Sequence, residues 1–574
     1  MQIEKLTTSF SYNQKTVELI PNKSNRFEEF YAEYTLTGLA GKAKGHRLQL
    51  TIHPKADLNL QLLRLRLPHQ FLAHETMFCN GFQSWSESRE YHHGAQIKGL
   101  RKIAYPWLKN YGDNHISLVE RGKGILHSWT YGYIRQHDFK MRFIGSLNEQ
   151  TGFTLIHYKS DNQLVTIDKE CEGMTLTHSF PIVDLVILEG DDQDVFDAYF
   201  ELMGIKKPKA KPATGWTSWY HYYTNISEEI ILKNLDAFAE KEAKIDFFQI
   251  DDGWQKEVGD WLNVKNNFPN GMAPIAQKIH RKGYKAGLWL APFICEKKSL
   301  IFQQKKHWLL KDAKGRPVKA GYAPGWSGDF YALDFYEKEV QDYLIKVFFT
   351  ILSQWNFDLV KLDFLYAACI LPRPNKTRAQ VMNEAMQFLR HVVGDKLILG
   401  CGVPLGSAFG LVDYCRIGAD IHLEWEHGML KFLRNRERVS TLLSLRATLN
   451  RWQLNGRAFL NDPDVFLLRE ENLKLNHTQK HTVLTVNALL GSLVFTSDFV
   501  GDYDEEKWAD FQQIFDYQHA EIKAVKRLGM DIYQIDFRIA DSAKTAVANL
   551  TDRPYNFVIN QAKHLLEAYE TVIL

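Results

Sequence analysis

Carboxylates at the ends of apolar runs are the residues of this sequence best placed to do chemistry. Asp251 and Asp252 follow the run FFQI, Asp363 ends LVKLD, and Asp420 ends CRIGAD. Apolar runs of this length are usually buried strands, which avoid acids, so an acid that ends such a run is expected at an edge. Grouped carboxylates can cleave a glycosidic bond, hold a divalent metal ion, or cap loops without any chemistry. For any single acid taken alone, loop capping is as good an explanation as glycoside cleavage or metal binding.

Two basic residues lie close in sequence to these acids. Lys361 precedes Asp363 by two positions and therefore shares its strand face, where a positive charge would hold the carboxylate ionised. Arg416 lies four residues before Asp420. The acids taken together fit glycoside cleavage, metal binding and loop capping, so the residues around them have to distinguish these three explanations. Further acids follow in the later apolar runs: Asp462, Asp464 and Asp498.

Tryptophans favour a sugar site over a metal site. Their rings pack well on the apolar C–H faces of pyranoses, whereas a hard metal ion has no need of them. We therefore expect sugar chemistry, with one ionised carboxylate as nucleophile and one protonated carboxyl as general acid. No metal and no cofactor are expected, and the segment HLEWEHG is not the HExxH zinc motif. The tryptophans interleaved with the acids are Trp216, Trp219, Trp254, Trp261 and Trp289.

The elements that must position these residues form a barrel pattern. From Gly215 onward, eight short apolar runs alternate with amphipathic segments such as ISEEIILKNLDAFAEKEA. Eight such units over roughly 300 residues predict a (β/α)8 barrel of the TIM type, which we place at residues 213–524. Catalytic residues of such barrels sit at the C-terminal ends of the strands. The glycine after Asp252 frees the backbone to turn both acids inward.

Two further regions flank the predicted barrel. Residues 1–190 hold short alternating runs broken by Gly, Asn and Asp, which predict a large β-sandwich. The helical spacing of DDQDVFDAYFELMGI and the Lys- and Pro-rich KKPKAKPATG predict a helix and a linker over 191–212. An alternating pattern returns over 525–574 and predicts a small C-terminal antiparallel β domain. The fold class is therefore multidomain.

Composition excludes several classes of partner. The chain has 574 residues, too many for one core, and its net charge of +2 gives no pull toward nucleic acid or an anionic membrane. No stretch of eighteen apolar residues occurs, and the N-terminus lacks the apolar core of a signal peptide. Six scattered cysteines without a CxxC pair are expected to be reduced thiols of a cytoplasmic protein. We leave open whether the protein is a monomer or a homo-oligomer.

Seven motifs together resemble a known family. TGWTSWYHYY, IDDGW, GLWLAPF, VKLDF, CRIGAD and NDPD occur in this order, with NGFQSWS upstream. These seven motifs resemble those of the α-galactosidases, or melibiases, of glycoside hydrolase family 36. The resemblance runs from about residue 75 to about residue 500, and the domain order fits the whole chain. It implies a retaining enzyme with a β-supersandwich, a (β/α)8 barrel and a C-terminal β domain. One departure is Phe82, where relatives often have tryptophan.

The resemblance assigns a role to each matching residue. Asp363 matches the family nucleophile and Asp420 the acid/base. Asp251 and Asp252 match the pair that binds the 4- and 6-hydroxyls of galactose. The other predicted substrate-binding residues are Lys361, Arg416, Trp219, Tyr220, Trp289, Trp254, Cys401 and Trp85, the last lent to the pocket by the N-terminal region.

The implied function is exo-hydrolysis, with retention, of terminal α-D-galactosides such as melibiose or raffinose. The loop GCGVPLG contains Cys401, and in this family that loop shapes the space beside the 2-substituent of the sugar. An α-N-acetylgalactosaminidase therefore stays an alternative, as does an α-galactosyl transferase of the raffinose-synthase type. A non-catalytic carbohydrate-binding protein is the alternative of another class. Loss of Asp363 or Asp420 would favour it, and both are present.

Overall fold

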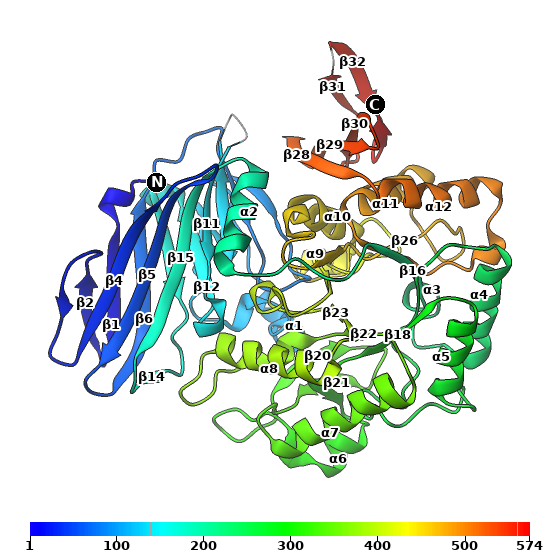
Figure 1. The fold of residues 1–574 in the computed structure, drawn as a ribbon, viewed down its shortest axis with the longest axis horizontal. Coiled ribbons are helices and arrows are strands. Elements are labelled where there is room, and N and C mark those ends of the chain that lie inside the picture. Colours follow the sequence, from blue (N-terminus) through cyan, green and yellow to red (C-terminus); the bar gives the residue numbers. More distant parts are fainter. Residues whose placement is uncertain (137–139, 560) are drawn as a thin grey trace.

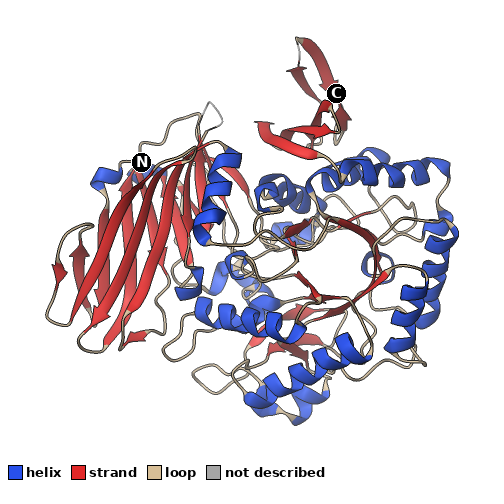
Figure 2. Ribbon diagram, in the orientation of Figure 1, coloured by secondary structure: helices blue, strands red, loops and turns tan. Residues whose placement is uncertain are grey.

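The chain forms antiparallel sheets near both ends and a curled parallel sheet between them. The computed structural model describes residues 1–136, 140–559 and 561–574. Helices gather around the parallel sheet, whereas the N-terminal part consists almost entirely of strands (Figures 1 and 2). The predicted multidomain architecture is confirmed at this level. The domain boundaries stay predictions.

Two antiparallel sheets form the N-terminal region. Along β4 (Phe30–Leu39), Phe30, Ala32 and Tyr34 are buried while the residues between them are exposed. Phe10 of one sheet and Leu50 of the other belong to the same apolar core, because each sheet has one apolar face to bury. One sheet has the order β2 (Lys15–Leu19), β1 (Thr7–Tyr12), β6 (Leu58–Pro68), β13 (Leu164–Lys169), β12 (Thr154–Lys159) and β9 (Ile125–Trp129), with β14 (Thr175–Leu176) beside β6. The other has the order β3 (Asn25–Arg26), β4, β5 (Lys44–Pro54), β15 (Phe180–Gly190), β11 (Met141–Ser146), β10 (Tyr131–Arg135), β7 (Thr76–Cys79) and β8 (Arg89–His92).

Helix α2 (Asp192–Met203) follows the last strand of this region. The Asp191 side chain accepts a hydrogen bond from the backbone N–H of Asp194 at 3.0 Å and so caps the first turn. The helix ends at Gly204, whose φ of 73° is a left-handed conformation that glycine adopts without strain. Its buried face packs on β11 and β15, and Figure 1 shows it between the sandwich and the parallel sheet.

The central sheet is parallel throughout and curls on itself. Its strands have the order β25 (Leu460–Asp462), β24 (Tyr414–Arg416), β23 (Leu397–Gly400), β22 (Leu359–Leu362), β18 (Lys285–Leu290), β17 (Phe247–Ile250), β16 (Ala213–Thr217), β27 (Leu493–Thr496) and β26 (Val465–Phe466). Only Pro463 and Asp464 separate β25 from β26, so the two ends of this order meet in the chain. Proline has no N–H to donate, which accounts for an interruption at this point.

Each of the eight apolar runs predicted as barrel strands overlaps at least one of these parallel strands. The run GWTSWY differs from the prediction in its second half. There β16 ends at Thr217, and Trp219–Tyr222 form the short helix α3. The backbone N–H of Tyr223 donates to Trp219 O at 2.7 Å, so the chain winds into a helical turn where a strand was expected.

Helices surround the parallel sheet. In α4 (Glu228–Glu240), Ile231, Leu235 and Phe238 are buried at the spacing of one helix face, and the Ser227 hydroxyl caps the first turn. The other helices of this region are α5 (Met272–Arg281), α6 (Leu300–Gln304), α7 (Lys338–Phe349), α8 (Arg378–Val393), α9 (Gly428–Phe432), α10 (Thr441–Asn450), α11 (His477–Leu490) and α12 (Glu505–Tyr517). A short helix of the N-terminal region is α1 (Tyr105–Leu108).

A small antiparallel sheet is inserted between β18 and β22. It has the order β19 (Ile294–Glu296), β21 (Gly328–Ala332) and β20 (Lys319–Ala323). The sequence pattern did not separate this insertion from the helical segments around it. Its β20–β21 hairpin supplies one residue of the candidate site described below.

The C-terminal strands form a separate layer above α10 to α12 (Figure 1). The main sheet has the order β28 (Glu521–Gly529), β29 (Ile532–Ile539), β30 (Ser542–Asn549) and β33 (Thr571–Ile573), and β31 (Tyr555–Ile559) pairs with β32 (Ala562–Leu566). The first strand begins at Glu521, four residues before the boundary predicted at 525. Every pairing in these sheets is antiparallel, as the alternating pattern predicts.

A buried arginine joins the sandwich to the parallel sheet. Arg451 donates from Nε to Asn80 Oδ1 at 2.9 Å, and from Nη1 to Ser84 O and Ile417 O at 2.7 Å each. Burial lowers the pKa of Arg451 to about 10. The loop that carries Trp85 is therefore attached firmly to the region of the acids.

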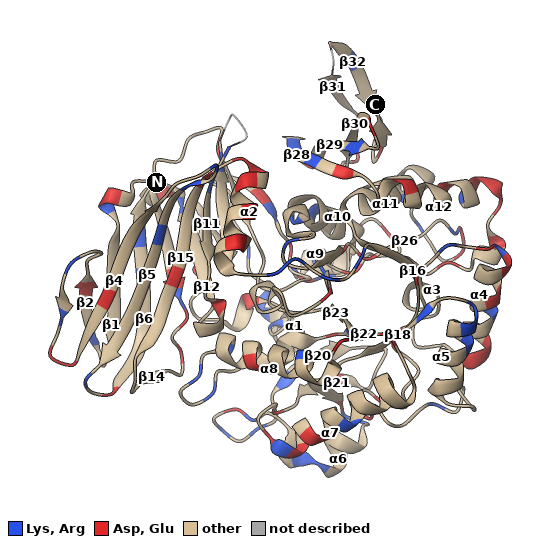
Figure 3. Cartoon of the chain, in the orientation of Figure 1, with Lys and Arg blue, Asp and Glu red and all other residues tan. Residues whose placement is uncertain are grey.

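Charges of both signs are spread over all parts of the molecule (Figure 3). Among the described residues, no helix is both long enough and apolar enough to cross a membrane. All six cysteines are buried and unpaired, as expected for reduced thiols.

Candidate active site

Strand β17 of the parallel sheet stops directly before Asp251 and Asp252. Gly253 follows with a φ of 119°, which residues with a side chain rarely adopt. A Cβ at this glycine would also lie only 2.8 Å from Thr224 Cα. The glycine therefore lets the chain turn at once, and both carboxylates are buried at the C-terminal end of the strand.

Asp251 is paired with Lys361. The Lys361 ammonium donates to Asp251 Oδ2 at 2.8 Å, and the Gln249 amide donates to the same oxygen at 3.0 Å. The sequence predicts that the charge of this lysine helps to keep Asp363 ionised, and the charge does lower the pKa of that carboxyl against the effect of burial. Its ion pair, however, is with Asp251, because the long side chain extends past β18, from β22 to the end of β17.

Asp252 is enclosed by two polar side chains. Gln255 Nε2 donates to Oδ1 at 2.6 Å, and Trp326 Nε1 donates to Oδ2 at 2.7 Å. Burial raises the pKa of Asp252 to about 6, although both hydrogen bonds favour the charged form. The sequence analysis missed Gln255 and Trp326. For Trp326, a single aromatic residue in the turn-like segment APGWSG was the available signal.

Asp363 follows β22 and is held as a hydrogen-bond acceptor. Trp289 Nε1 donates to Oδ2 at 2.9 Å, and the backbone N–H of Phe364 donates to Oδ1 at 2.9 Å. Burial raises the pKa of Asp363, the charge of Lys361 opposes this rise, and the charge of Asp420 adds to it. Phe364 has a φ of 53°, and such strain at a bulky residue is typical of functional sites.

Arg416 in β24 gathers three carboxylates. Its guanidinium lies 2.5 Å from Asp420 Oδ1, 2.9 Å from Asp462 Oδ2 and 2.8 Å from Asp464 Oδ1. Asp462 and Asp464 are fully buried, whereas the side chain of Asp420 keeps 32% of its surface exposed. Asp420 is therefore the member of this group that can reach a ligand or water.

Helix α3 is tied to the same group. The Tyr220 hydroxyl donates to Asp464 Oδ2, which also accepts the backbone N–H of Ile421 at 2.8 Å. The aromatic segment after β16 thus lies beside the residue that follows Asp420. Trp219 is partly exposed there, although its ring meets that of Tyr223 edge-on, with 5.1 Å between centroids.

Trp85 enters the site from the N-terminal region. Its Nε1 lies 3.2 Å from Cys401 Sγ, and its ring centroid is 5.1 Å from that of Phe364. Gly402, with a φ of 61°, makes this approach possible, because a Cβ there would lie 2.9 Å from Trp85 Cη2. The structure therefore brings Trp85 and Cys401 next to the residue that follows Asp363.

Trp254 does not line the site as predicted. It has no exposed surface, and its Nε1 donates to the backbone oxygen of Trp289 at 2.9 Å, so it packs behind the residue that donates to Asp363. Trp216 and Trp261 are also fully buried core residues. The sequence analysis used five tryptophans as evidence for a sugar site, but three of them are core residues. Large aromatic side chains also fill protein cores, so their presence near the acids in sequence does not place them in the site.

One group among the described residues has the spacing of a metal site, and it lies in the sandwich. Glu120, His157 and Asp168 have ligand atoms within 4.8 Å of one another. Arg64 donates to Glu120 Oε1 at 2.7 Å and to Asp168 Oδ1 at 2.6 Å. A metal ion would have to displace this guanidinium, so the group fits an ion-pair network better than a metal centre.

Comparisons with known proteins match this chain to α-galactosidases. A melibiase family profile matches residues 209–392. The α-galactosidase Mel36A of Lactobacillus acidophilus is 28% identical over 153 residues, which is 25% of this chain and 20% of that protein. This sequence match thus spans only about a fifth of the relative.

Solved structures match over nearly the whole chain. The α-galactosidase of Thermus thermophilus, in complex with p-nitrophenyl α-D-galactopyranoside, is 26% identical with a TM-score of 0.70 over 92% of this chain and 97% of that one. The family 36 α-galactosidase of Geobacillus stearothermophilus shares the fold, with a TM-score of 0.63 and 12% identity over 99% of this chain and 88% of that one. In its fold and in the matched part of its sequence, the chain is similar to glycoside hydrolases. The resemblance to the melibiases of glycoside hydrolase family 36 is confirmed.

Proposed function

We propose that this protein is a retaining exo-α-galactosidase. The observation that carries the proposal is a pair of carboxylates, one directly after β22 and one in the loop that follows β24. Asp363 is buried and held by Trp289 and Phe364, whereas Asp420 is partly exposed and anchored by Arg416. A retaining glycosidase needs two carboxyl groups in such different surroundings. The ligand of the Thermus thermophilus relative, an α-galactoside, supports the choice of sugar.

Each residue then takes a defined part in the reaction. The Asp363 carboxylate attacks the anomeric carbon while Asp420 gives a proton to the leaving oxygen, and a covalent glycosyl ester forms. Asp420, now a base, takes a proton from water, which attacks the same carbon and releases the sugar. Asp251 and Asp252 accept hydrogen bonds from the 4- and 6-hydroxyls. We further infer that the curled sheet is the closed (β/α)8 barrel of this family.

The position of Trp85 supports exo action. Eight loops around a barrel mouth leave an open face, but a site for one terminal sugar has to be closed on several sides. Trp85 and the loop that contains Cys401 lie against each other beside Phe364. They would form the wall that the barrel alone does not supply.

A panel of p-nitrophenyl glycosides tests the proposal. We expect hydrolysis of the α-galactoside, with α-galactose as the first product in the proton NMR spectrum. Faster hydrolysis of the α-N-acetylgalactosaminide would support the galactosaminidase alternative, and galactose binding without turnover would support a carbohydrate-binding protein. Release of β-galactose first would contradict the retaining mechanism.

Azide rescue tests the roles of the two acids. Asp363→Ala and Asp420→Ala should each lose several orders of magnitude in kcat, because they lose the nucleophile and the acid/base. Added azide can fill either vacated site, and it should give β-galactosyl azide with the first variant and α-galactosyl azide with the second. Asp236→Ala, exposed on α4, is the control and should keep full activity. Near-normal turnover by Asp363→Ala would disprove its assignment.

A further inference from the structure

Trp326 is an aromatic residue of the site that no barrel strand supplies. It lies between β20 and β21, in the inserted hairpin. Its Nε1 donates to Asp252 Oδ2 at 2.7 Å. Its ring centroid lies 5.4 Å from that of Phe364 and 6.3 Å from that of Trp289, the two residues that donate to Asp363. One side chain therefore touches both a carboxylate expected to bind sugar hydroxyls and the wall beside the nucleophile.

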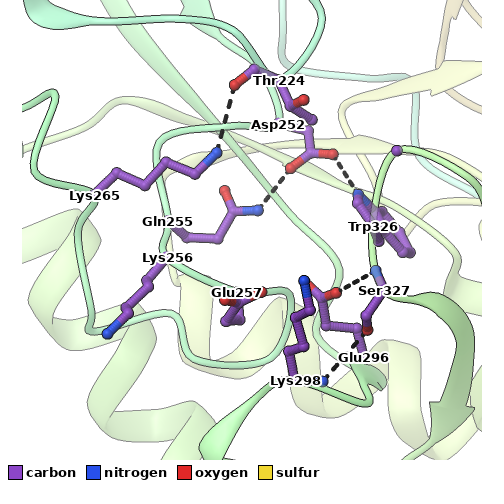
Figure 4. A pocket seen from close by; sticks show the side chains of 11 residues that line it. Thr224, Asp252, Gln255, Lys256, Glu257, Lys265, Glu296, Lys298, Trp326 and Ser327 are labelled. Atoms are coloured by element: carbon purple, nitrogen blue, oxygen red, sulfur yellow. Dashed lines mark hydrogen bonds between the residues drawn. The ribbon is translucent and has the colours of Figure 1, made fainter.

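A polar cavity of about 210 Å³ lies next to this contact. Figure 4 shows it from close by, with Gln255 and Trp326 both bonded to Asp252 at one end and Lys298 near Glu296 at the other. Both oxygens of Glu296 accept backbone N–H groups, from Val258 at 2.9 Å and from Ser327 at 2.7 Å. This carboxylate is therefore already engaged.

Three lysines line the cavity, and Figure 4 shows the side chain of Lys256 pointing away from Lys265 and Lys298. Neither Lys265 nor Lys298 lies within 4.0 Å of a carboxylate oxygen among the described residues, and the Lys265 ammonium contacts only Thr224 O, at 3.4 Å. An ammonium group without a partner attracts an anion or a polar oxygen. The cavity can hold several heavy atoms, since one water occupies about 30 Å³.

We propose that Trp326 determines specificity at C6 by separating the sugar pocket from this polar side cavity. The proposal rests on the proposed function, because it takes Asp252 to bind the 4- and 6-hydroxyls. In the native protein the indole would close that end of the pocket and hold the Asp252 carboxylate in place, so that an unsubstituted hydroxymethyl group fits best. Without the indole, a small substituent on O6 would enter the cavity, and an anionic one would meet Lys265 and Lys298.

Variants of Trp326 separate the role of the ring from that of its N–H group. Trp326→Ala removes both, so kcat/KM for the 6-phosphate and the 6-O-methyl ether of p-nitrophenyl α-galactoside, each relative to the parent galactoside, should rise at least tenfold. Trp326→Phe keeps a ring but loses the donor to Asp252. It should keep the native ratios, with a raised KM and an acid limb of kcat/KM that moves to higher pH, because one donor that favours the Asp252 carboxylate is gone.

Removal of the lysines identifies the kind of substituent. Adding Lys265→Met and Lys298→Met to Trp326→Ala should abolish the gain for the 6-phosphate but keep that for the 6-O-methyl ether. Trp508→Ala, on the outer helix α12, is the matched control and should change neither ratio. Trp326→Leu provides a smaller truncation if the alanine variant does not fold.

The outcomes distinguish this inference from the proposed function. A native protein that hydrolyses no α-galactoside would overturn both. A native enzyme that is active, with Trp326→Ala and Trp326→Leu variants that fold but show unchanged ratios, would overturn only the role of Trp326. Equal gains for the phosphate with and without the lysines would overturn the anion preference of the cavity.

Discussion

Replacing Lys361 with methionine should damage both stability and catalysis. Methionine keeps most of the side-chain length but removes the charge that lies 2.8 Å from Asp251 Oδ2. Only 7% of the Lys361 side chain and 3% of the Asp251 side chain are exposed, so water cannot replace the lost partner. Removal of one partner from a buried ion pair costs about 3–5 kcal/mol, because the other charge stays buried alone.

Catalysis should change for a second reason. The charge of Lys361 lowers the pKa of Asp363, against the effect of burial. Without that charge the pKa of Asp363 rises, so a smaller fraction of the carboxylate is ionised at a given pH. The acid limb of kcat/KM against pH should therefore move to higher pH. Thermal melting and the pH profile for p-nitrophenyl α-galactoside measure the two effects separately.

A double variant tests the physical cause. Lys361→Met together with Asp251→Asn leaves no unpaired charge, so it should melt closer to the native protein than Lys361→Met alone, although it stays poorly active. Lys338→Met removes an exposed pair on α7 and should change neither measurement. The reasoning would be refuted if Lys361→Met had native melting and a native acid limb, or if the double variant lost the sum of the two single losses.

Three further predictions concern the ends of the sugar pocket. If Asp251 and Asp252 bind the axial 4-hydroxyl, p-nitrophenyl α-glucoside should have a kcat/KM roughly two to four decades below that of the galactoside, because each unpaired charged hydrogen bond costs about 1.5–3 kcal/mol; comparable rates would contradict this role. Trp85→Ala should lower the melting temperature, since truncation of a buried tryptophan costs about 3–5 kcal/mol, and should weaken inhibition by galactose by about 1–2 kcal/mol. Normal inhibition in a variant that melts lower would place Trp85 outside the pocket. Because burial raises the pKa of Asp252 to about 6 and its charged form accepts the hydroxyls, kcat/KM should fall as the pH drops below about 6, and Asp252→Asn should lose the part of this fall that Asp252 causes while keeping the part caused by protonation of Asp363.

The sequence alone determined the order of elements and the positions of the acids. Alternating runs predicted antiparallel sheets at both ends of the chain, and eight apolar runs separated by amphipathic segments predicted the central parallel sheet. These are local properties, because the side-chain periods of strands and helices follow from backbone geometry within a few residues. The position of the acids at strand ends could also be predicted from the sequence, because charged side chains are rarely buried within a strand. Their assignment to chemical roles came from the resemblance and stays a prediction.

Only the tertiary structure decided which side chains meet. Lys361 pairs with Asp251, 110 positions away, and Trp85 meets Cys401, 316 positions away. Trp326 reaches Asp252 from an inserted hairpin that no strand pattern indicated, and Trp254 is buried behind a wall residue. Such partners depend on how the sheet curls and how the sandwich loop packs against it. No short stretch of sequence carries that information, because the contacts join segments whose separation along the chain is unrelated to their distance in space.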